Sequence, residues 1–172
     1  VAMYYITWRT GKPDPGMMVN GMLAGLVAIT APCAFVAPWA AAVIGAVAAV
    51  IAIESVFLWD KLHVDDPVGA IAVHGMCGTF GVLAVGIFAN GKYGAGWNGS
   101  SSAGVEGIIK GEWGQLGAQA VGALVLWTVI FGIAFAFFKI QNKFTKGGIR
   151  VTAEDEIQGL DLPEMGVLAY ND

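Results

Sequence analysis

The chain has 172 residues, of which 56% are hydrophobic and 13% charged, and its mean hydropathy is +0.67. This composition excludes an ordinary soluble globular domain and indicates an integral membrane protein. The formal net charge of −4 comes with no basic patch, so the composition gives no indication of a nucleic-acid partner.

Apolar stretches that are long enough to cross a bilayer follow one another along the chain. Residues 1–8 resemble the end of an apolar helix, which suggests that the sequence is a fragment of a longer chain. Because about 20 apolar residues cross a hydrocarbon core, complete spans are predicted at about 17–35, 39–59, 67–89 and 113–139. The predicted transmembrane region is therefore 1–147, followed by a polar tail at 148–172.

Basic residues are distributed unevenly over the predicted connections. One side of the membrane receives seven of them, namely Arg9, Lys12, Lys61, Lys139, Lys143, Lys146 and Arg150, and the other side receives Lys92 and Lys110. Because cytoplasmic loops carry the excess of Lys and Arg, the C-terminus is predicted to be cytoplasmic.

Small residues are frequent within the predicted spans. Gly21 and Gly25 form a GxxxG pair, and Gly75, Gly78 and Gly81 follow one another at three-residue intervals. Such spacing favours close packing of membrane helices. Cys33 and Cys77 lie in apolar spans and are interpreted as packing residues, because no cysteine or histidine spacing typical of a zinc site occurs.

The stretch VDDPVGAIAVHGMCGTFG, residues 64–81, contains the most informative residue of the chain, His74. Asp65 or Asp66 is predicted to cap a helix whose first turn accepts Pro67. His74 then lies about 10 Å along the helix and therefore towards the middle of the membrane. An ionisable residue at that depth indicates a pathway for ions, protons or polar substrates. The alternative is a buried histidine whose hydrogen bond ties two helices together.

Three other polar residues each have a simple structural interpretation. Thr30 is expected to hydrogen-bond to its own helix unless it faces a pore. Glu54 is expected to be a solvated or paired acid near the membrane interface, within reach of Lys61. His63 lies in the connection before the His74 span and is interpreted as a surface residue.

Three ordered motifs resemble the ammonium transporter (Amt/Mep/Rh) family. The first is VDDPVGAIAVHGMCGTFGVLAVGIFA, in which a D-D-P stretch leads into the helix that carries the second of two pore histidines in the family. The second is GMLAGLVAITAPCA, residues 21–34, which resembles a pore-lining helix. The third is GIRVTAEDEIQGLDLPEMGVLAY, residues 148–170, which resembles the cytoplasmic C-terminal region.

The resemblance implies an all-α, polytopic membrane helix bundle that forms the second half of an eleven-helix, inverted-repeat fold, in a homotrimer. It implies transport in which ammonium is deprotonated and neutral NH3 passes a pair of histidines, one of them His74. Ala70 and Thr30 would line the pore, and Asp66 would be an acid at its cytoplasmic end. The first pore histidine would lie in helices that this sequence lacks. No enzymatic activity, cofactor or metal is implied.

The tail resembles the segment that contacts neighbouring subunits and receives PII-type regulatory proteins in the family. The resemblance assigns this regulatory role to Arg150, Gly159, Asp161 and Tyr170. Pro163 departs from a phosphorylatable G-x-D-x-T pattern of some relatives, which argues against phosphorylation at this position. The alternative is a tail that only packs beneath the trimer.

Other functions remain open at this level. A sensor would use the same pore fold and signal through the tail, and a structural membrane subunit would not transport at all. A haem-binding subunit is disfavoured, because it would need a second intramembrane histidine on a facing helix. Each of these alternatives implies a multi-pass protein, and the family resemblance implies the cell membrane.

Overall fold

The computed structural model describes residues 1–94 and 104–168, and every regular element in these ranges is a helix. Apart from the helices, one isolated bridge pairs Asn90 with Glu106. The predicted all-α fold class is therefore confirmed. The chain divides into two compact units, residues 1–125 and 126–172.

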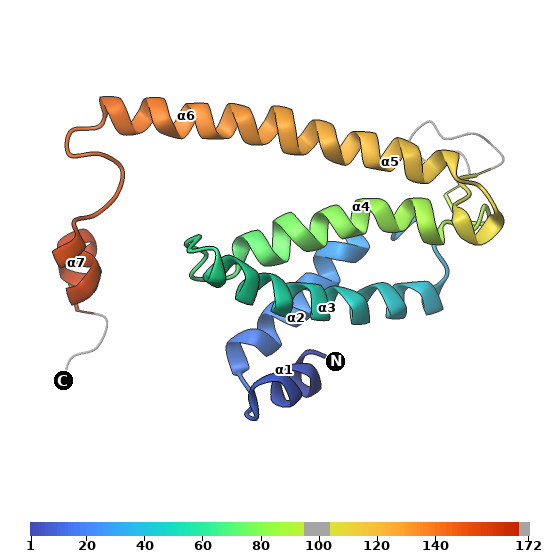
Figure 1. Cartoon of the computed structure of the whole chain (residues 1–172), viewed down its shortest axis with the longest axis horizontal. Coiled ribbons are helices and arrows are strands. Elements are labelled where there is room, and N and C mark those ends of the chain that lie inside the picture. The colour runs from blue at the N-terminus through green and yellow to red at the C-terminus, as the bar shows by residue number, and fades with distance from the viewer. Residues whose placement is uncertain (95–103, 169–172) are drawn as a thin grey trace. The chain divides into compact units, whose positions relative to one another are not determined.

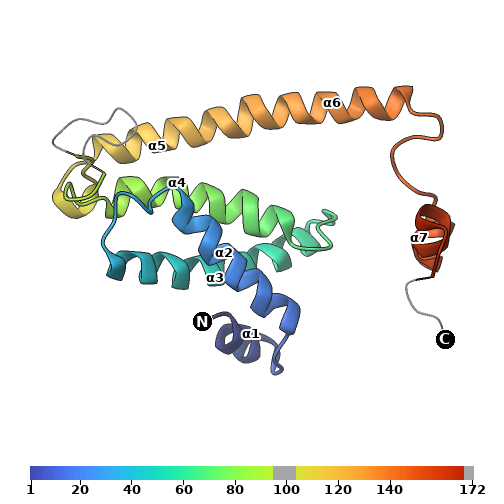
Figure 2. The same ribbon diagram turned by 180° about the vertical axis from the view of Figure 1, so that it is seen from behind.

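The first unit is a packed group of helices. Its elements are α1 (Ala2–Thr10), α2 (Pro15–Thr30), α3 (Pro38–Lys61), the π-helix η1 (Ile71–Met76), α4 (Cys77–Phe88), the 3-10 helix η3 (Ile108–Lys110) and α5 (Gly114–Val125). Figure 1 shows α2 crossing α3 and α4, and Figure 2 shows the same crossing from behind. Because η1 runs directly into α4, one continuous helix of 18 residues carries His74.

Helix starts in this unit follow from local sequence. The Asp14 side chain accepts a hydrogen bond from the Met17 N–H at 3.0 Å, and Pro15 takes the first helical position of α2. Proline fits there because its missing N–H would have had no helical partner. Pro38 begins α3 in the same way.

A stripe of apolar side chains on α3 forms the centre of the core. Ala40, Ile44, Ala48 and Ala52 recur every four residues, so they share one face of the helix. All four are at most 1% exposed. In the same cluster they pack with Ala24 and Ala28 of α2, Val73 of η1, and Cys77 and Ala84 of α4.

Glycines allow segments of this unit to approach closely, and Gly21, Gly25 and Gly81 do so between helices. A Cβ on Gly21 would collide with Ala2, and one on Gly25 would lie 3.6 Å from the Gly45 Cα atom. A Cβ on Gly81 would collide with the Ala28 backbone. The close helix packing that the glycine spacing predicts is therefore confirmed at these positions.

The second unit contains η4 (Leu126–Ile130), α6 (Phe131–Phe144), α7 (Ala153–Gln158) and η5 (Asp161–Met165). The apolar side chains of α6 are exposed, with Phe131, Phe135, Phe137 and Phe138 each 55–60% accessible. At the start of α7, the Thr152 hydroxyl accepts a hydrogen bond from the Asp155 N–H at 3.2 Å. This contact satisfies one of the free donors at the helix terminus.

Within the described residues, three helices are long and apolar enough to cross a membrane: Pro38–Lys61, Ile71–Phe88 and Gly114–Phe144. The predicted span 39–59 falls within the first of them, and the predicted span 113–139 overlaps the third, starting one residue before it. The predicted span 17–35 overlaps the shorter apolar helix α2, which begins at Pro15, ends at Thr30 and is followed by turns.

The helix predicted to begin at Pro67 begins instead at Ile71, so this boundary was wrong. Pro67 lies in a turn, and Gly69 adopts a left-handed conformation with φ +71°. A residue in that conformation cannot continue a right-handed helix, so the regular helix starts only after it.

Candidate functional site

His74 lies in η1, the π-helical turn that opens the α4 span. The Cys77 N–H points at both the Ala72 and the His74 carbonyl oxygens, so the ordinary i to i−4 ladder is interrupted here. A π-helical turn accommodates an extra residue within a helix and occurs frequently at functional sites. The backbone at His74 is therefore π-helical, whereas the backbone of the following helix α4 is α-helical.

The two faces of this turn have different environments. Ala72, Val73 and Cys77 are at most 2% exposed, and the Cys77 thiol donates to the Ala48 carbonyl oxygen at 3.4 Å. His74 and Ala70, one turn apart, are exposed instead. The His74 ring makes no hydrogen bond with the residues that the structure describes. The alternative of a buried histidine that ties two helices is therefore not supported within this part of the chain.

Asp66 caps the helix that carries His74, as predicted, although the amides that it binds lie five and six residues further along the chain. Its carboxylate oxygens accept from the Ile71 N–H at 3.0 Å and from the Ala72 N–H at 3.1 Å. These amides belong to the first helical turn and would otherwise have no partner. A negative charge at a helix N-terminus also interacts favourably with the helix dipole. Asp66 thus holds the backbone just before His74.

Thr30 does not lie beside His74. Val27 of α2 packs at Gly78 and Ala28 packs at Gly81, so α2 and α4 run in the same direction and Thr30 lies on the order of 10 Å beyond His74. The Thr30 hydroxyl donates to the Leu26 carbonyl oxygen of its own helix at 2.8 Å, and the side chain is exposed. The structure therefore brings Ala70 and His74 together and leaves Thr30 apart.

Asn20 is a polar residue at this site that the sequence analysis did not single out. Its side-chain amide donates to the Val68 carbonyl oxygen at 3.3 Å, in the turn that precedes η1. An amide inside the apolar stretch 17–35 was the available signal, but a single polar residue in a membrane span does not identify its partner.

Glu54 is paired, as predicted, but its partners lie on α1 and do not include Lys61. The Tyr5 hydroxyl donates to its Oε1 atom at 2.7 Å, and the Arg9 Nε donates to the same oxygen at 3.2 Å. The Arg9 guanidinium also lies 5.1 Å from the centre of the Phe57 ring. This polar cluster connects α1 to the C-terminal part of α3.

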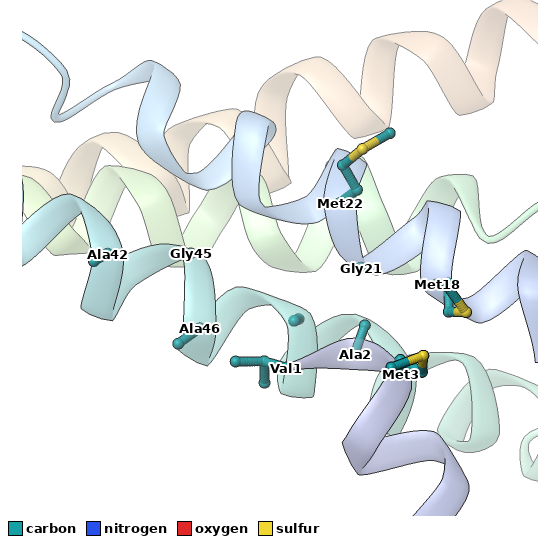
Figure 3. A pocket seen from close by; sticks show the side chains of 10 residues that line it. Val1, Ala2, Met3, Met18, Gly21, Met22, Ala42, Gly45 and Ala46 are labelled. Carbon is teal, nitrogen blue, oxygen red and sulfur yellow. The ribbon is translucent and has the colours of Figure 1, made fainter. Parts of the chain in front are cut away.

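An open apolar groove of about 370 Å³ lies between α1, α2 and α3 (Figure 3). Its walls are formed by small residues and methionines: Val1, Ala2, Met3, Met18, Gly21, Met22, Ala42, Gly45, Ala46 and Ala49. None of the predicted pore residues lines it.

The predicted tail residues are exposed where the structure describes them. The Arg150 guanidinium lies 4.0 Å from the Glu156 carboxylate, Gly159 ends α7 with φ +99°, and Asp161 begins η5. Tyr170 lies outside the described residues. His63 is exposed in the connection after α3, and its Nδ1 atom lies 3.2 Å from the Lys61 carbonyl oxygen. No cluster of three or more potential metal ligands occurs in residues 1–94 and 104–168.

Comparisons with known proteins agree with this fold. Residues 1–170 match the Ammonium Transporter Family. The chain is 49% identical over 166 residues to ammonium transporter Amt2 of Archaeoglobus fulgidus, covering 96% of this chain and 35% of that protein. It is 35% identical over 170 residues to the ammonium transporter of Bacillus subtilis, covering 97% of this chain and 40% of that protein.

Solved structures give the same result. The crystal structure of Saccharomyces cerevisiae Mep2 matches with a TM-score of 0.78 and 28% identity, over 89% of this chain and 34% of Mep2. Candida albicans Mep2 matches with a TM-score of 0.77 and 29% identity, over 90% of this chain and 33% of that structure. The chain thus spans roughly a third of the length of these relatives. Its sequence and its fold together show that the chain belongs to the ammonium transporter family.

Proposed function

We propose that this chain supplies one side of a pore that takes up ammonium by deprotonating it and conducting neutral NH3. The observation that carries the proposal is the exposed His74 ring, on a π-helical turn whose opposite face is anchored in the core. In this proposal the ring faces a passage that is completed by the remaining two thirds of the transporter. We call the assembled protein the complete transporter.

The chemistry follows from the membrane as a solvent. An apolar passage cannot replace the hydration shell of ammonium, whereas neutral ammonia enters at a much lower desolvation cost. A neutral imidazole offers one hydrogen-bond donor and one acceptor, and it can relay a proton because histidine titrates near neutrality. His74 would act with a second histidine from outside this chain. The proton that ammonium releases would cross separately along this pair, so that NH3 and the proton together carry one charge across the membrane.

The other predicted residues take supporting roles. Ala70 lies one turn before His74 on the same exposed face, so its small side chain would leave room beside the imidazole. Thr30 would contribute to the lining on the order of 10 Å further along the passage. Asp66 would stabilise the cytoplasmic end of the His74 helix through its two amide contacts.

The assembly and orientation are part of the same proposal. We infer a homotrimer in the cell membrane from the resemblance to the family. We infer a cytoplasmic C-terminus because most basic residues of the predicted connections lie on that side. The exposed tail, including Arg150, Gly159 and Asp161, would then be accessible to a PII-type regulatory protein. Binding of purified PII to the complete transporter, compared with a variant lacking residues 148–172, tests this part.

The decisive experiment replaces His74 by alanine in the complete transporter, reconstituted in vesicles. Ammonium-evoked current and the preference for ammonium over other monovalent cations are measured across pH. We expect the variant to lose current or selectivity, while His63→Ala, a change of the other histidine in an exposed connection, keeps both. Unchanged current and selectivity in His74→Ala would remove this residue from the transport mechanism.

A further inference from the structure

The turn before the His74 helix is held from the side by a residue of another helix. Asn20 lies on α2, and its Nδ2 atom donates to the Val68 carbonyl oxygen at 3.3 Å. These residues are 48 positions apart in the sequence, so the contact joins two elements that are distant along the chain.

The contact is made at a tight place. Gly69, next to Val68, has φ +71°, and a Cβ added there would lie 2.6 Å from the Asn20 Nδ2 atom and 3.6 Å from the Val56 side chain. The turn is therefore packed between Asn20 of α2 and Val56 of α3. Because Gly69 is buried between these two side chains, a change at Asn20 is expected to move the turn.

The same turn is bonded to the helix that carries His74. The Gly69 N–H donates to the Asp66 carbonyl oxygen at 3.0 Å, and the Val73 N–H donates to the Gly69 carbonyl oxygen at 2.8 Å. The Asp66 carboxylate accepts from two further amides of the first turn. A short hydrogen-bonded path thus leads from Asn20 to the residue immediately before His74.

We propose that Asn20 is a positioning residue, which fixes the start of the His74 helix relative to α2 and thereby sets where the imidazole lies in the passage. The inference rests on the proposed function of His74. Asn20 acts through the turn formed by residues 66–69, and it makes no contact with the transported species in this account. A histidine pair that exchanges protons and holds ammonia needs its rings at hydrogen-bond distance, so small displacements matter.

The test compares Asn20→Asp with Asn142→Asp in the complete transporter. Aspartate has nearly the size of asparagine but lacks the N–H donor, so it places a carboxylate against the Val68 carbonyl oxygen. Asn142 uses its Oδ1 atom, which accepts from the Ile149 N–H at 2.9 Å and is retained in aspartate. If Asn20→Asp fails to accumulate, Asn20→Ala removes the donor without adding a charge, and the same expectations apply.

The first readout is ammonium flux per reconstituted transporter molecule. It is measured for the parent, for each single variant and for the double variant of Asn20→Asp with His74→Ala, which together form a double-mutant cycle. We expect Asn20→Asp to lower maximal flux about tenfold, because misplacing a functional group by 1 Å can reduce a rate by up to about 100-fold. In the His74→Ala background the same change should have no further effect, since residues that act through one another are not additive. Parental flux in Asn20→Asp, or an equal loss in both backgrounds, would overturn the inference.

The second readout is amide hydrogen exchange of the peptide that covers residues 68–76, which does not depend on transport. Faster exchange in Asn20→Asp, with parental exchange in Asn142→Asp, supports the role of Asn20 in holding the turn. Parental exchange in both variants would contradict it. If His74→Ala keeps full flux and selectivity, the proposed pore function fails by itself, and the exchange measurement still decides whether Asn20 holds this turn.

Discussion

The contact between α2 and α4 at Gly81 gives the sharpest test of the packing. A Cβ on residue 81 would lie 2.9 Å from the Ala28 Cα atom and 3.0 Å from its carbonyl carbon, and it would also meet the carbonyl oxygen. Ordinary contacts of such atoms begin at 3.4 Å. Because the obstacle is backbone, rotation of a side chain cannot relieve it, and in Gly81→Ala the two helices must separate by about 0.5 Å or more.

The magnitude follows from overpacking of a closely fitted interior. Added methylenes in such positions destabilise by about 1–3 kcal/mol, and alanine recovers up to about 1 kcal/mol through its higher helix propensity than glycine. We therefore expect Gly81→Ala to lower the free energy of unfolding by up to about 2 kcal/mol once the propensity gain is subtracted, and to be about 1–3 kcal/mol less stable than an alanine variant without the clash. The neighbouring contacts of Ala24, Ala84 and Cys77 in the same cluster would weaken as the helices separate.

The assay is denaturation of the detergent-purified complete transporter in increasing SDS, followed by the loss of helical circular dichroism. Gly78→Ala is the matched control, because its added Cβ would meet only the Val27 side chain at 3.8 Å, an ordinary contact. This control should be neutral or slightly stabilised, since it gains helix propensity without a clash. Equal midpoints for Gly81→Ala and Gly78→Ala would refute the reasoning, because they would mean that the close approach at Ala28 has no energetic effect.

Three further predictions concern polar contacts of the described residues. Asp66→Ala should destabilise by about 0.5–2 kcal/mol through loss of the helix cap, and faster amide exchange at residues 71–72 would report it. Glu54→Ala should remove the coupling between Glu54 and Tyr5, so that Tyr5→Phe destabilises the parent protein but not the Glu54→Ala variant in an SDS titration. Thr152→Ala should fray α7; cleavage of the tail by protease would then be faster than in Thr145→Ala, whose hydroxyl bonds only to the preceding helix.

Most of the helical arrangement could be predicted from composition and spacing. Runs of apolar residues indicate where helices lie, and the glycine intervals indicate close contacts such as the one at Gly81. The start of the His74 helix was placed four residues too early because Pro67 suits a first helical turn. The sequence does not show that Gly69 adopts a left-handed conformation, which depends on how the turn packs between α2 and α3.

The candidate site was predictable only in part, for a similar reason. His74 and Asp66 stand out because ionisable residues are rare in apolar stretches. The π-helical turn has no comparable signal in the sequence, and the packing of Val73 and Cys77 against other helices is likewise visible only in the structure. Asn20 was missed because its importance lies in a contact with a residue 48 positions away.

We expect the buried face of the η1 turn to serve folding and its exposed face to serve transport. Val73 and Cys77 fix the backbone from the core side, so substitutions there should change stability first and flux only as a consequence. Ala70 and His74 are exposed and contribute little to this core, so their substitution should change flux while the unfolding midpoint stays near that of the parent. If His74→Ala destabilised the protein as strongly as Cys77→Ser, the imidazole would be a packing residue in the complete transporter. In that case the passage would have to run elsewhere.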